Sequence, residues 1–132
     1  MTFYQINDMS KKVLLVGHCG PDSSYLKMVV RSANPKAQIL MADDRNELNN
    51  ALEQGVDLAL FNRELGYGFD ESRGVEVIRS LKEMRPEQRM MLVSNYPEAQ
   101  EAAEQAGALP GFGKREIGSP RVVQLLKDAL GD

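Results

Sequence analysis

The sequence predicts one doubly wound α/β domain, a parallel sheet with helices on both faces. Five short apolar runs alternate along the 132-residue chain with stretches whose apolar residues recur at helical spacing. The run at 57–62 is apolar on both faces, as is typical of a central strand in a parallel sheet. Alternating strands and helices favour right-handed crossovers and helices on both sides of the sheet. The expected strand order is therefore 2-1-3-4-5, that of flavodoxin-like (βα)5 domains.

Capping residues mark where the predicted helices begin. Asp22 is the expected N-cap of the first helix, because its carboxylate can accept hydrogen bonds from free backbone N–H groups. Asp44 and Glu47 have the spacing of a capping-box variant at the start of the second helix. The remaining elements are expected as strands at 12–17, 38–42, 57–62, 90–94 and 108–113, and as helices at 74–84, 98–106 and from 119 onward.

The composition indicates a globular domain spanning residues 11–132, preceded by a polar N-terminal tail at 1–10. Hydrophobic residues make up 42% of the chain and charged residues 27%. The formal net charge is −3 and no basic stripe is present, so we expect no direct nucleic-acid binding. No apolar run approaches the roughly 20 residues of a membrane span. A single cysteine excludes an internal disulfide and suits a reducing compartment, so a cytoplasmic location is expected.

The ends of the strands are where this fold class places its chemistry. The run at 57–62 ends on Asn62, and a long loop rich in glycine and acidic residues follows. His18 and Cys19 follow the first strand, but adjacent residues in such a turn point apart. The position six residues after Cys19 holds Tyr25, not the arginine of a tyrosine-phosphatase-like pattern. We therefore expect Cys19 to pack at the loop and His18 to be a polar cap.

From residue 11 to residue 130 the sequence resembles the receiver domain of two-component response regulators. No single motif is specific, but the ordered set is. Its parts are the five β/α units, Asp57-Leu-Ala-Leu-Phe ahead of the key position, Gly74-Val-Glu-Val-Ile, Ser94, Ala106-Gly107-Ala108 and Lys114.

The resemblance implies a phosphorylation pocket that has lost part of its machinery. A receiver accepts a phosphoryl group from a histidine kinase on an Asp, with an acidic pair holding magnesium and with a Ser or Thr and a Lys nearby. The acidic pair falls on Gly17 and His18, and the phosphoacceptor falls on Asn62, whereas Ser94 and Lys114 match. An amide does not attack phosphorus as a carboxylate does, and Gly17 and His18 offer magnesium no oxygen ligand. The chain is thus expected to be a pseudo-receiver without enzyme activity, aspartyl phosphate, magnesium or other cofactor.

The expected role is binding of signalling proteins, such as a histidine kinase, an output domain or a second copy of the chain. The resemblance places the partner face on the fourth helix, fifth strand and fifth helix. It comprises Gln100, Glu104, Gly111, Phe112 and Arg121, with Gly111 at the position of the switch aromatic and Phe112 packing beside it.

Two alternatives concern the long loop at 63–73. A displaced acid, Glu64 or Asp70, could accept the phosphoryl group, and either could pair with Lys114 if that lysine does not lie in solvent. Tyr67 and Phe69 either form a recognition tip or fold back over the pocket. A small-molecule sensor at the vacated pocket is the third hypothesis.

Overall fold

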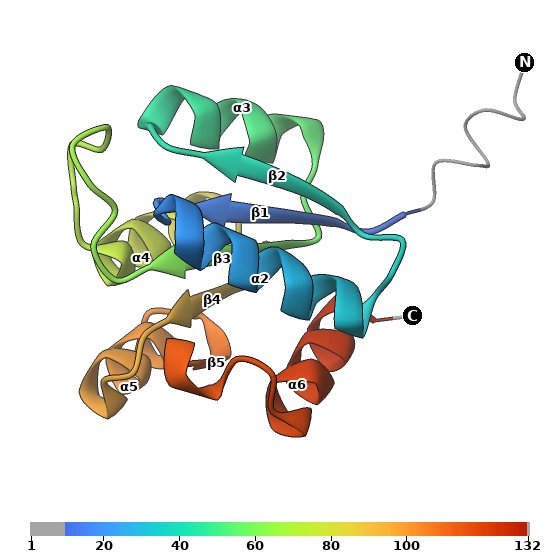
Figure 1. The fold of residues 1–132 in the computed structure, drawn as a ribbon. Coiled ribbons are helices and arrows are strands. Elements are labelled where there is room, and N and C mark those ends of the chain that lie inside the picture. Colours follow the sequence, from blue (N-terminus) through green and yellow to red (C-terminus); the bar gives the residue numbers. More distant parts are fainter. Residues whose placement is uncertain (1–9, 132) are drawn as a thin grey trace, which may run out of the picture.

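The computed structural model describes residues 10–131, so the tail at 1–9 lies outside the described part. Figure 1 shows one five-stranded parallel sheet in the order β2-β1-β3-β4-β5, as the sequence predicts. Every strand points the same way, so all carboxyl ends meet at one edge. The strands are β1 (Lys12–Val16), β2 (Gln38–Ala42), β3 (Leu58–Asn62), β4 (Met90–Val93) and β5 (Leu109–Phe112).

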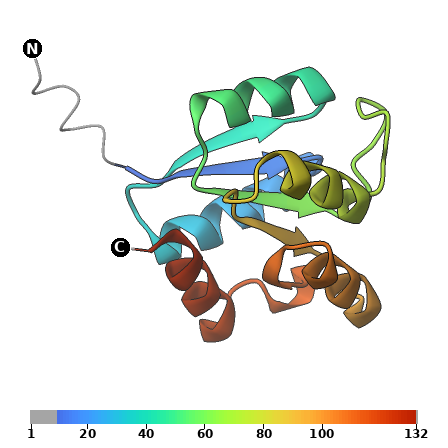
Figure 2. The same ribbon diagram turned by 180° about the vertical axis from the view of Figure 1, so that it is seen from behind.

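Helices cover both faces of the sheet, with a separate apolar core under each face (Figures 1 and 2). The first face carries α2 (Gly20–Ala33) and α6 (Pro120–Leu130). The second carries α3 (Arg45–Gln54), α4 (Gly74–Met84) and α5 (Pro97–Gln105). A short 3-10 turn, η1 (Lys114–Glu116), joins β5 to α6.

Strand β3 lies at the centre of the sheet between β1 and β4. Its four apolar residues have no exposed surface, and their side chains alternate between the two cores. Leu58 and Leu60 contribute to the core under α2 and α6, whereas Ala59 and Phe61 contribute to the core under α3 to α5. The strand therefore carries Asn62 to the carboxyl edge, opposite Val93 of β4.

Side-chain oxygens cap the first turns of α3 and α6, but not that of α2. Asp44 accepts a hydrogen bond from the backbone N–H of Glu47 (2.8 Å), and the Glu47 carboxylate accepts from Asp43 N–H (2.7 Å). The capping box is confirmed, although its return contact goes one residue further back. The assignment of Asp22 was wrong: Cys19 is the N-cap of α2 and makes no side-chain cap bond, while Asp22 lies in the first turn. Ser119 caps α6 through Val122 N–H.

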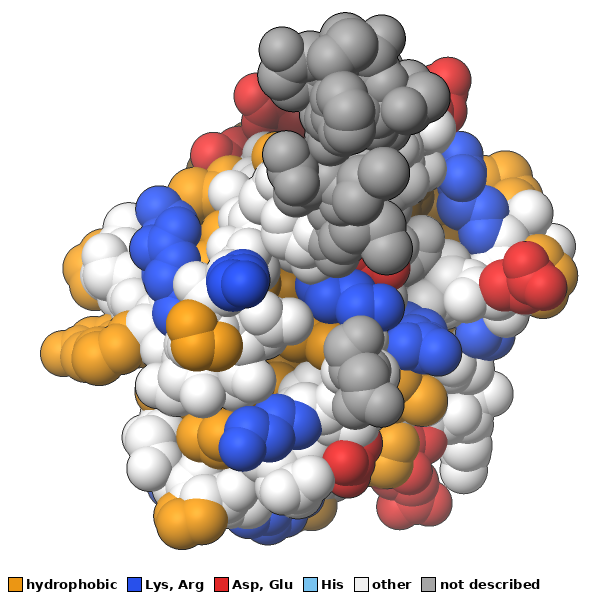
Figure 3. Space-filling view, turned by 90° about the vertical axis from the view of Figure 1, so that its right-hand side faces the viewer, with side chains coloured by type: hydrophobic (Ala, Val, Ile, Leu, Met, Phe, Trp, Pro, Cys, Tyr) orange, Lys and Arg blue, Asp and Glu red, His pale blue; other side chains and the backbone are white. Residues whose placement is uncertain are grey.

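A groove of about 810 Å³ lies at the opposite edge of the sheet, at the amino ends of the strands. Figure 3 shows this side, with Lys and Arg side chains spread among apolar and acidic ones. Its lining includes Lys11, Met84, Arg85 and Arg89. None of the helices within residues 10–131 combines the length and apolar character of a membrane-spanning helix.

Candidate functional site

A smaller pocket of about 230 Å³ lies at the carboxyl edge, between the ends of β3, β4 and β5. Three of the five residues that the sequence assigns to the degenerate pocket line it, namely Asn62, Ser94 and Lys114. Gly17 and His18 do not. The lining also includes Arg63, Glu64, Val93, Asn95 and Tyr96.

The side-chain amide of Asn62 is hydrogen-bonded at both ends. Its Nδ2 donates to the carbonyl oxygen of Gly17 (3.0 Å), and its Oδ1 accepts from the backbone N–H of Arg63 (2.9 Å). A carboxylate could accept from Arg63 but could not donate to Gly17, so the first contact requires an amide. Asn62 therefore ties the end of β3 to the loop after β1.

Leu65 closes the space beside Gly17. Gly17 has a φ of +72°, a region that favours glycine. A Cβ at Gly17 would lie 2.8 Å from the Cα and Cδ2 of Leu65, which is itself 4% exposed. The backbone conformation and the packing against Leu65 thus both oppose an acidic side chain at position 17. Any side chain there would have to displace the loop.

The residues at this edge do not fit a magnesium ion. Magnesium prefers several oxygen ligands in octahedral geometry. Across residues 10–131 no group of three or more carboxylate, imidazole or thiol side chains is arranged to hold a metal. Glu64 is the carboxylate in the pocket lining, and it lies on the exposed side at 3.9 Å from Arg63.

His18 lies in the interior instead of capping the pocket, so that expectation was wrong. The residue is 6% exposed, and its Nε2 donates to the carbonyl oxygen of Leu60 (2.9 Å). Nδ1 is buried without a hydrogen-bond partner among the described residues. Burial lowers the pKa of His18 from 6.5 to about 4, so the imidazole is neutral near pH 7. Cys19, expected to pack, is exposed.

Lys114 forms its ion pair with Asp22, at 2.6 Å, and not with Glu64 or Asp70. The hydrogen bond from Lys114 lowers the pKa of Asp22, so the carboxylate is charged at neutral pH. Both side chains are partly exposed. The sequence contains Asp22 as a plausible cap, but it gives no sign that the first turn of α2 faces the end of β5. Lys114 is thus directed toward the β1–α2 side of the pocket.

Ser94 uses its hydroxyl oxygen within its own loop. The residue is buried, and Oγ accepts a hydrogen bond from the backbone N–H of Tyr96 (3.2 Å). In the same pocket, the guanidinium of Arg63 lies 4.8 Å from the centre of the Tyr96 ring, a cation–π contact. Neither residue could be singled out from the sequence, because their contact depends on the loop after β3 lying beside the loop after β4.

The two ends of the long loop after β3 are hydrogen-bonded to each other, and the loop does not cover the pocket. At its base, Leu65 N–H donates to Ser72 O (2.7 Å) and Gly74 N–H to Arg63 O (2.8 Å). Hydrogen bonds from Arg73 to Glu71 lower the pKa of Glu71 to about 2. The two backbone bonds at the base hold the two sides of the loop together.

The two aromatic residues of the loop have different environments. Phe69 is 6% exposed and belongs to the core under α3 to α5, whereas Tyr67 is fully exposed. The tip contacts the β2–α3 connection, where Arg45 N–H donates to Gly68 O (3.0 Å). Asp70 is exposed. None of Tyr67, Phe69 and Asp70 lines the pocket, so of the two alternatives for the aromatics the one in which they fold back over the pocket does not hold.

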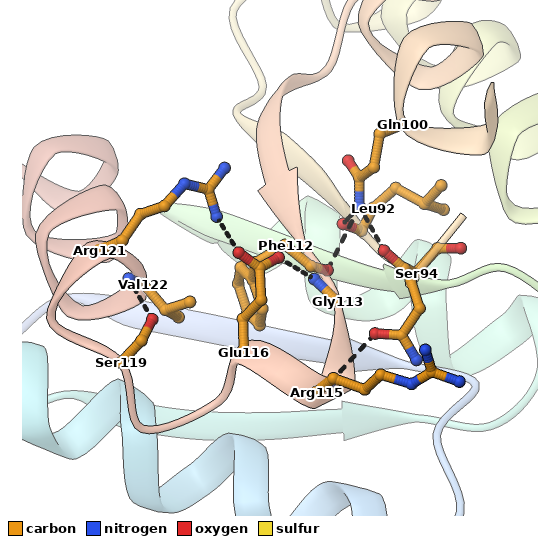
Figure 4. Close-up of polar contacts among 11 residues, drawn as sticks. Leu92, Ser94, Gln100, Phe112, Gly113, Arg115, Glu116, Ser119, Arg121 and Val122 are labelled. Atoms are coloured by element: carbon orange, nitrogen blue, oxygen red, sulfur yellow. Dashed lines mark hydrogen bonds and ion pairs between the residues drawn. The ribbon is translucent and has the colours of Figure 1, made fainter. Parts of the chain in front are cut away.

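The expected partner face is only partly a surface. Glu104 and Arg121 are exposed, but Gly111 and Phe112 are buried, and Phe112 packs in the core under α2 and α6. The Gln100 amide is directed inward, toward the backbone of β4 and β5 (Figure 4). Gln100, Gly111 and Phe112 were therefore wrongly assigned to the contact surface. The packing of Phe112 was predicted correctly.

The turn after β5 is held by side chains on both sides. Glu116 accepts from Gly113 N–H (2.9 Å) and pairs with Arg121 (2.6 Å), as Figure 4 shows. Arg115 N–H donates to the side-chain oxygen of Asn95 (3.0 Å). A proline at this position would have no N–H and could not make that bond.

Solved structures with a similar fold include receiver domains of response regulators and a response regulator. The receiver domain of a DNA-binding response regulator (merR) from Colwellia psychrerythraea has a TM-score of 0.71 at 14% identity, covering 90% of this chain and 97% of that one. A putative response regulator from Chloroflexus aurantiacus has a TM-score of 0.72 at 17% identity, covering 92% and 98%. The receiver domain of NarL from Mycobacterium tuberculosis has a TM-score of 0.65 at 20% identity, covering 93% and 98%.

No protein-family model and no curated protein matches the sequence. The likeness is therefore one of structure, spread over nine-tenths of the chain at low identity. It agrees with the strand order and with the two helical layers. The chain has the fold of response-regulator receiver domains.

Proposed function

We propose that this chain is a receiver-like signalling module that acts by binding other proteins, without aspartyl phosphorylation. The observation that carries the proposal is the Asn62 amide, which occupies the phosphoacceptor position and is bonded at both ends. An amide nitrogen held against a carbonyl oxygen is not a nucleophile toward phosphorus. The module would therefore sit in a two-component or phosphorelay pathway as a binding partner, not as a phosphate carrier.

Two further contacts support this function. Leu65 fills the space beside Gly17, where a metal-binding acid would be needed. Asp22 neutralises Lys114, the cation that would otherwise stabilise charge on a transferring phosphoryl group. Both contacts compete directly with phosphoryl transfer at this edge.

The partners we propose are signalling proteins: a histidine kinase, an output domain or a second copy of this chain. Receiver-fold neighbours are regulators of this class. The exposed part of the proposed contact surface includes Glu104 and Arg121. A cytoplasmic location fits this role.

The test is an NMR titration with beryllofluoride and magnesium, followed by amide chemical shifts. We expect no shifts centred on Asn62, Ser94 and Lys114, because Asn62 has an amide in place of a carboxylate and residues 10–131 form no cluster able to hold a metal. A phosphorylatable receiver run in parallel is the positive control. Magnesium-dependent shifts centred on those three residues would overturn the proposal.

A displaced acid is the second candidate, because Glu64 lines the pocket. Incubation with labelled acetyl phosphate distinguishes it. The favoured function predicts no hydroxylamine-sensitive label on the wild type, whereas phosphorylation at Glu64 predicts a label that Glu64→Gln removes and Asp70→Asn leaves. A small-molecule sensor is not favoured, because about 230 Å³ is below the size of common ligand pockets.

A further inference from the structure

The Gln100 side chain connects three segments of backbone at the end of the sheet. From α5, its Nε2 donates to the carbonyl oxygens of Leu92 (2.9 Å), Ser94 (3.1 Å) and Phe112 (3.2 Å), as Figure 4 shows. All three partners can only accept. The amide orientation is therefore fixed by chemistry, since a rotated amide would set its own oxygen against three carbonyl oxygens.

The Gln100 amide lies where the β4–β5 ladder is irregular, because the register shifts between Met91 and Val93. The Phe112 carbonyl oxygen also accepts from the backbone N–H of Ser94 (2.9 Å), so Gln100 adds a second hydrogen bond to it. Gly111 allows the close approach: a Cβ at this position would overlap the Leu92 carbonyl oxygen and would lie 2.7 Å from Gln100 Oε1. The Gln100 amide thus adds hydrogen bonds at the irregular end of the ladder and depends on a glycine in β5.

Helix α5 buries few side chains. Ala103 is its one fully buried residue within the described chain, compared with Gly74, Val77, Ile78 and Leu81 in α4. Apolar burial scales with area, so α5 gains less from packing than α4. The hydrogen bonds from Gln100 add to this limited apolar packing.

We propose that Gln100 is a positioning residue that latches α5 to the ends of β4 and β5 and holds them in a single arrangement. Ser94, at the end of β4, lines the pocket, and Glu104 of α5 and Arg121 of α6 are exposed. With the latch closed, the surface around Glu104 and Arg121 has one state, whatever occupies the pocket. The proposal stands on the Gln100 contacts and not on the absence of phosphorylation.

The test is Gln100→Met, which keeps the length and volume of the side chain but removes the donor. We expect Ser94 and Gly113 amides to exchange with solvent about tenfold faster, because at least one net hydrogen bond is lost. We also expect new microsecond–millisecond exchange in relaxation-dispersion NMR at Ala99 and Phe112. The matched control is Gln105→Met, at an exposed glutamine on the same helix, which should change neither measurement.

Gln100→Glu provides a second route to the same test, since a carboxylate cannot donate to the three carbonyl oxygens. Both variants should lose protection at Ser94 and Gly113. Unchanged exchange at these two amides in Gln100→Met would overturn the latch. Beryllofluoride shifts at Asn62 would contradict the proposed function and leave these exchange results unaffected, so the two failures are distinguishable.

Discussion

His18 is held neutral in the protein interior by burial, with Nε2 donating to the Leu60 carbonyl oxygen. The nearest charged groups that act on it are Lys114, which lowers its pKa, and Asp22, which raises it. These two charges form an ion pair with each other, so burial determines the net shift. A buried imidazole of this kind contributes to stability only while it is uncharged.

We expect acid to destabilise the fold through His18. The pKa of His18 is about 4 in the folded state and near 6.5 in the unfolded chain, so the unfolded state binds a proton first as the pH falls. The free energy of unfolding should therefore decrease as the pH falls from about 6.5 toward 4, by up to about 3 kcal/mol. Urea unfolding at pH 7, 6 and 5 measures this loss.

His18→Gln is the comparison for that experiment, because glutamine does not titrate and can donate to Leu60. Its stability should depend less on pH between 6.5 and 5 than that of the wild type. Asp22 acts in a separate range: its lowered pKa means that its contribution is present above about 3.8 and is lost below it. Equal slopes for the two proteins between pH 6.5 and 5 would contradict the role of His18.

Several residues at the carboxyl edge could be predicted from the sequence and others could not. Asn62, Ser94 and Lys114 follow apolar runs, so their meeting at one edge follows from the strand pattern. The Lys114–Asp22 pair and the interior position of His18 depend on loop conformation, which no periodicity describes. Gln100 was misplaced because a glutamine in a polar helix looks the same whether its amide faces solvent or backbone.

In the loop between β3 and α4, Phe69 is buried in the core and Tyr67 is exposed to solvent. Phe69 enters the core, and the backbone of Gly68 is bonded to Arg45. Tyr67, two residues before the anchor, is fully exposed. The same short segment therefore combines a fixed base with a free aromatic ring.

This arrangement predicts opposite outcomes for two neighbouring substitutions. Phe69→Ala should lower the free energy of unfolding by about 3 kcal/mol, because it leaves a cavity in the core. Tyr67→Ala should change it by less than about 0.5 kcal/mol, because the ring buries no surface. Denaturant unfolding of both variants measures the difference. Similar losses in the two proteins would mean that the loop does not pack as described.

At the level of elements, the regular parts were the predictable ones. The bounds of β2 and α4 match the predicted 38–42 and 74–84, because each has a clear apolar pattern between well-defined ends. The other strands end within one residue or so of their predicted limits. Strand β5 contains a proline and a glycine, and the register shift beside it is typical of a strand with such residues.

Across the whole molecule, burial is unevenly distributed. Strands β1 and β3 lie inside the sheet with both faces covered, whereas α5 packs through little apolar surface. Local opening is easiest where few apolar contacts must break. Stability should thus rise from α5 toward the centre of the sheet.

Native-state hydrogen exchange tests this ranking. We expect amides of β1 and β3 to exchange only through global unfolding, and amides of α5 to exchange faster through a smaller opening. The dependence of each rate on low concentrations of denaturant separates the two routes. If α5 amides exchanged as slowly as those of β3, and with the same denaturant dependence, the ranking would be wrong.

The packing of Leu65 against Gly17 has a consequence for engineering a phosphate-accepting site into this chain: several changes would have to be made in order. Writing carboxylates back into positions 17 and 62 leaves a leucine in the space for a cation and a left-handed backbone at the first acid. The loop at 63–73 would need to be shortened first, and Asp22 would need to release Lys114 second. Only then could new acids act together. A carboxylate at position 62 alone would therefore leave both the Leu65–Gly17 packing and the Lys114–Asp22 ion pair in place.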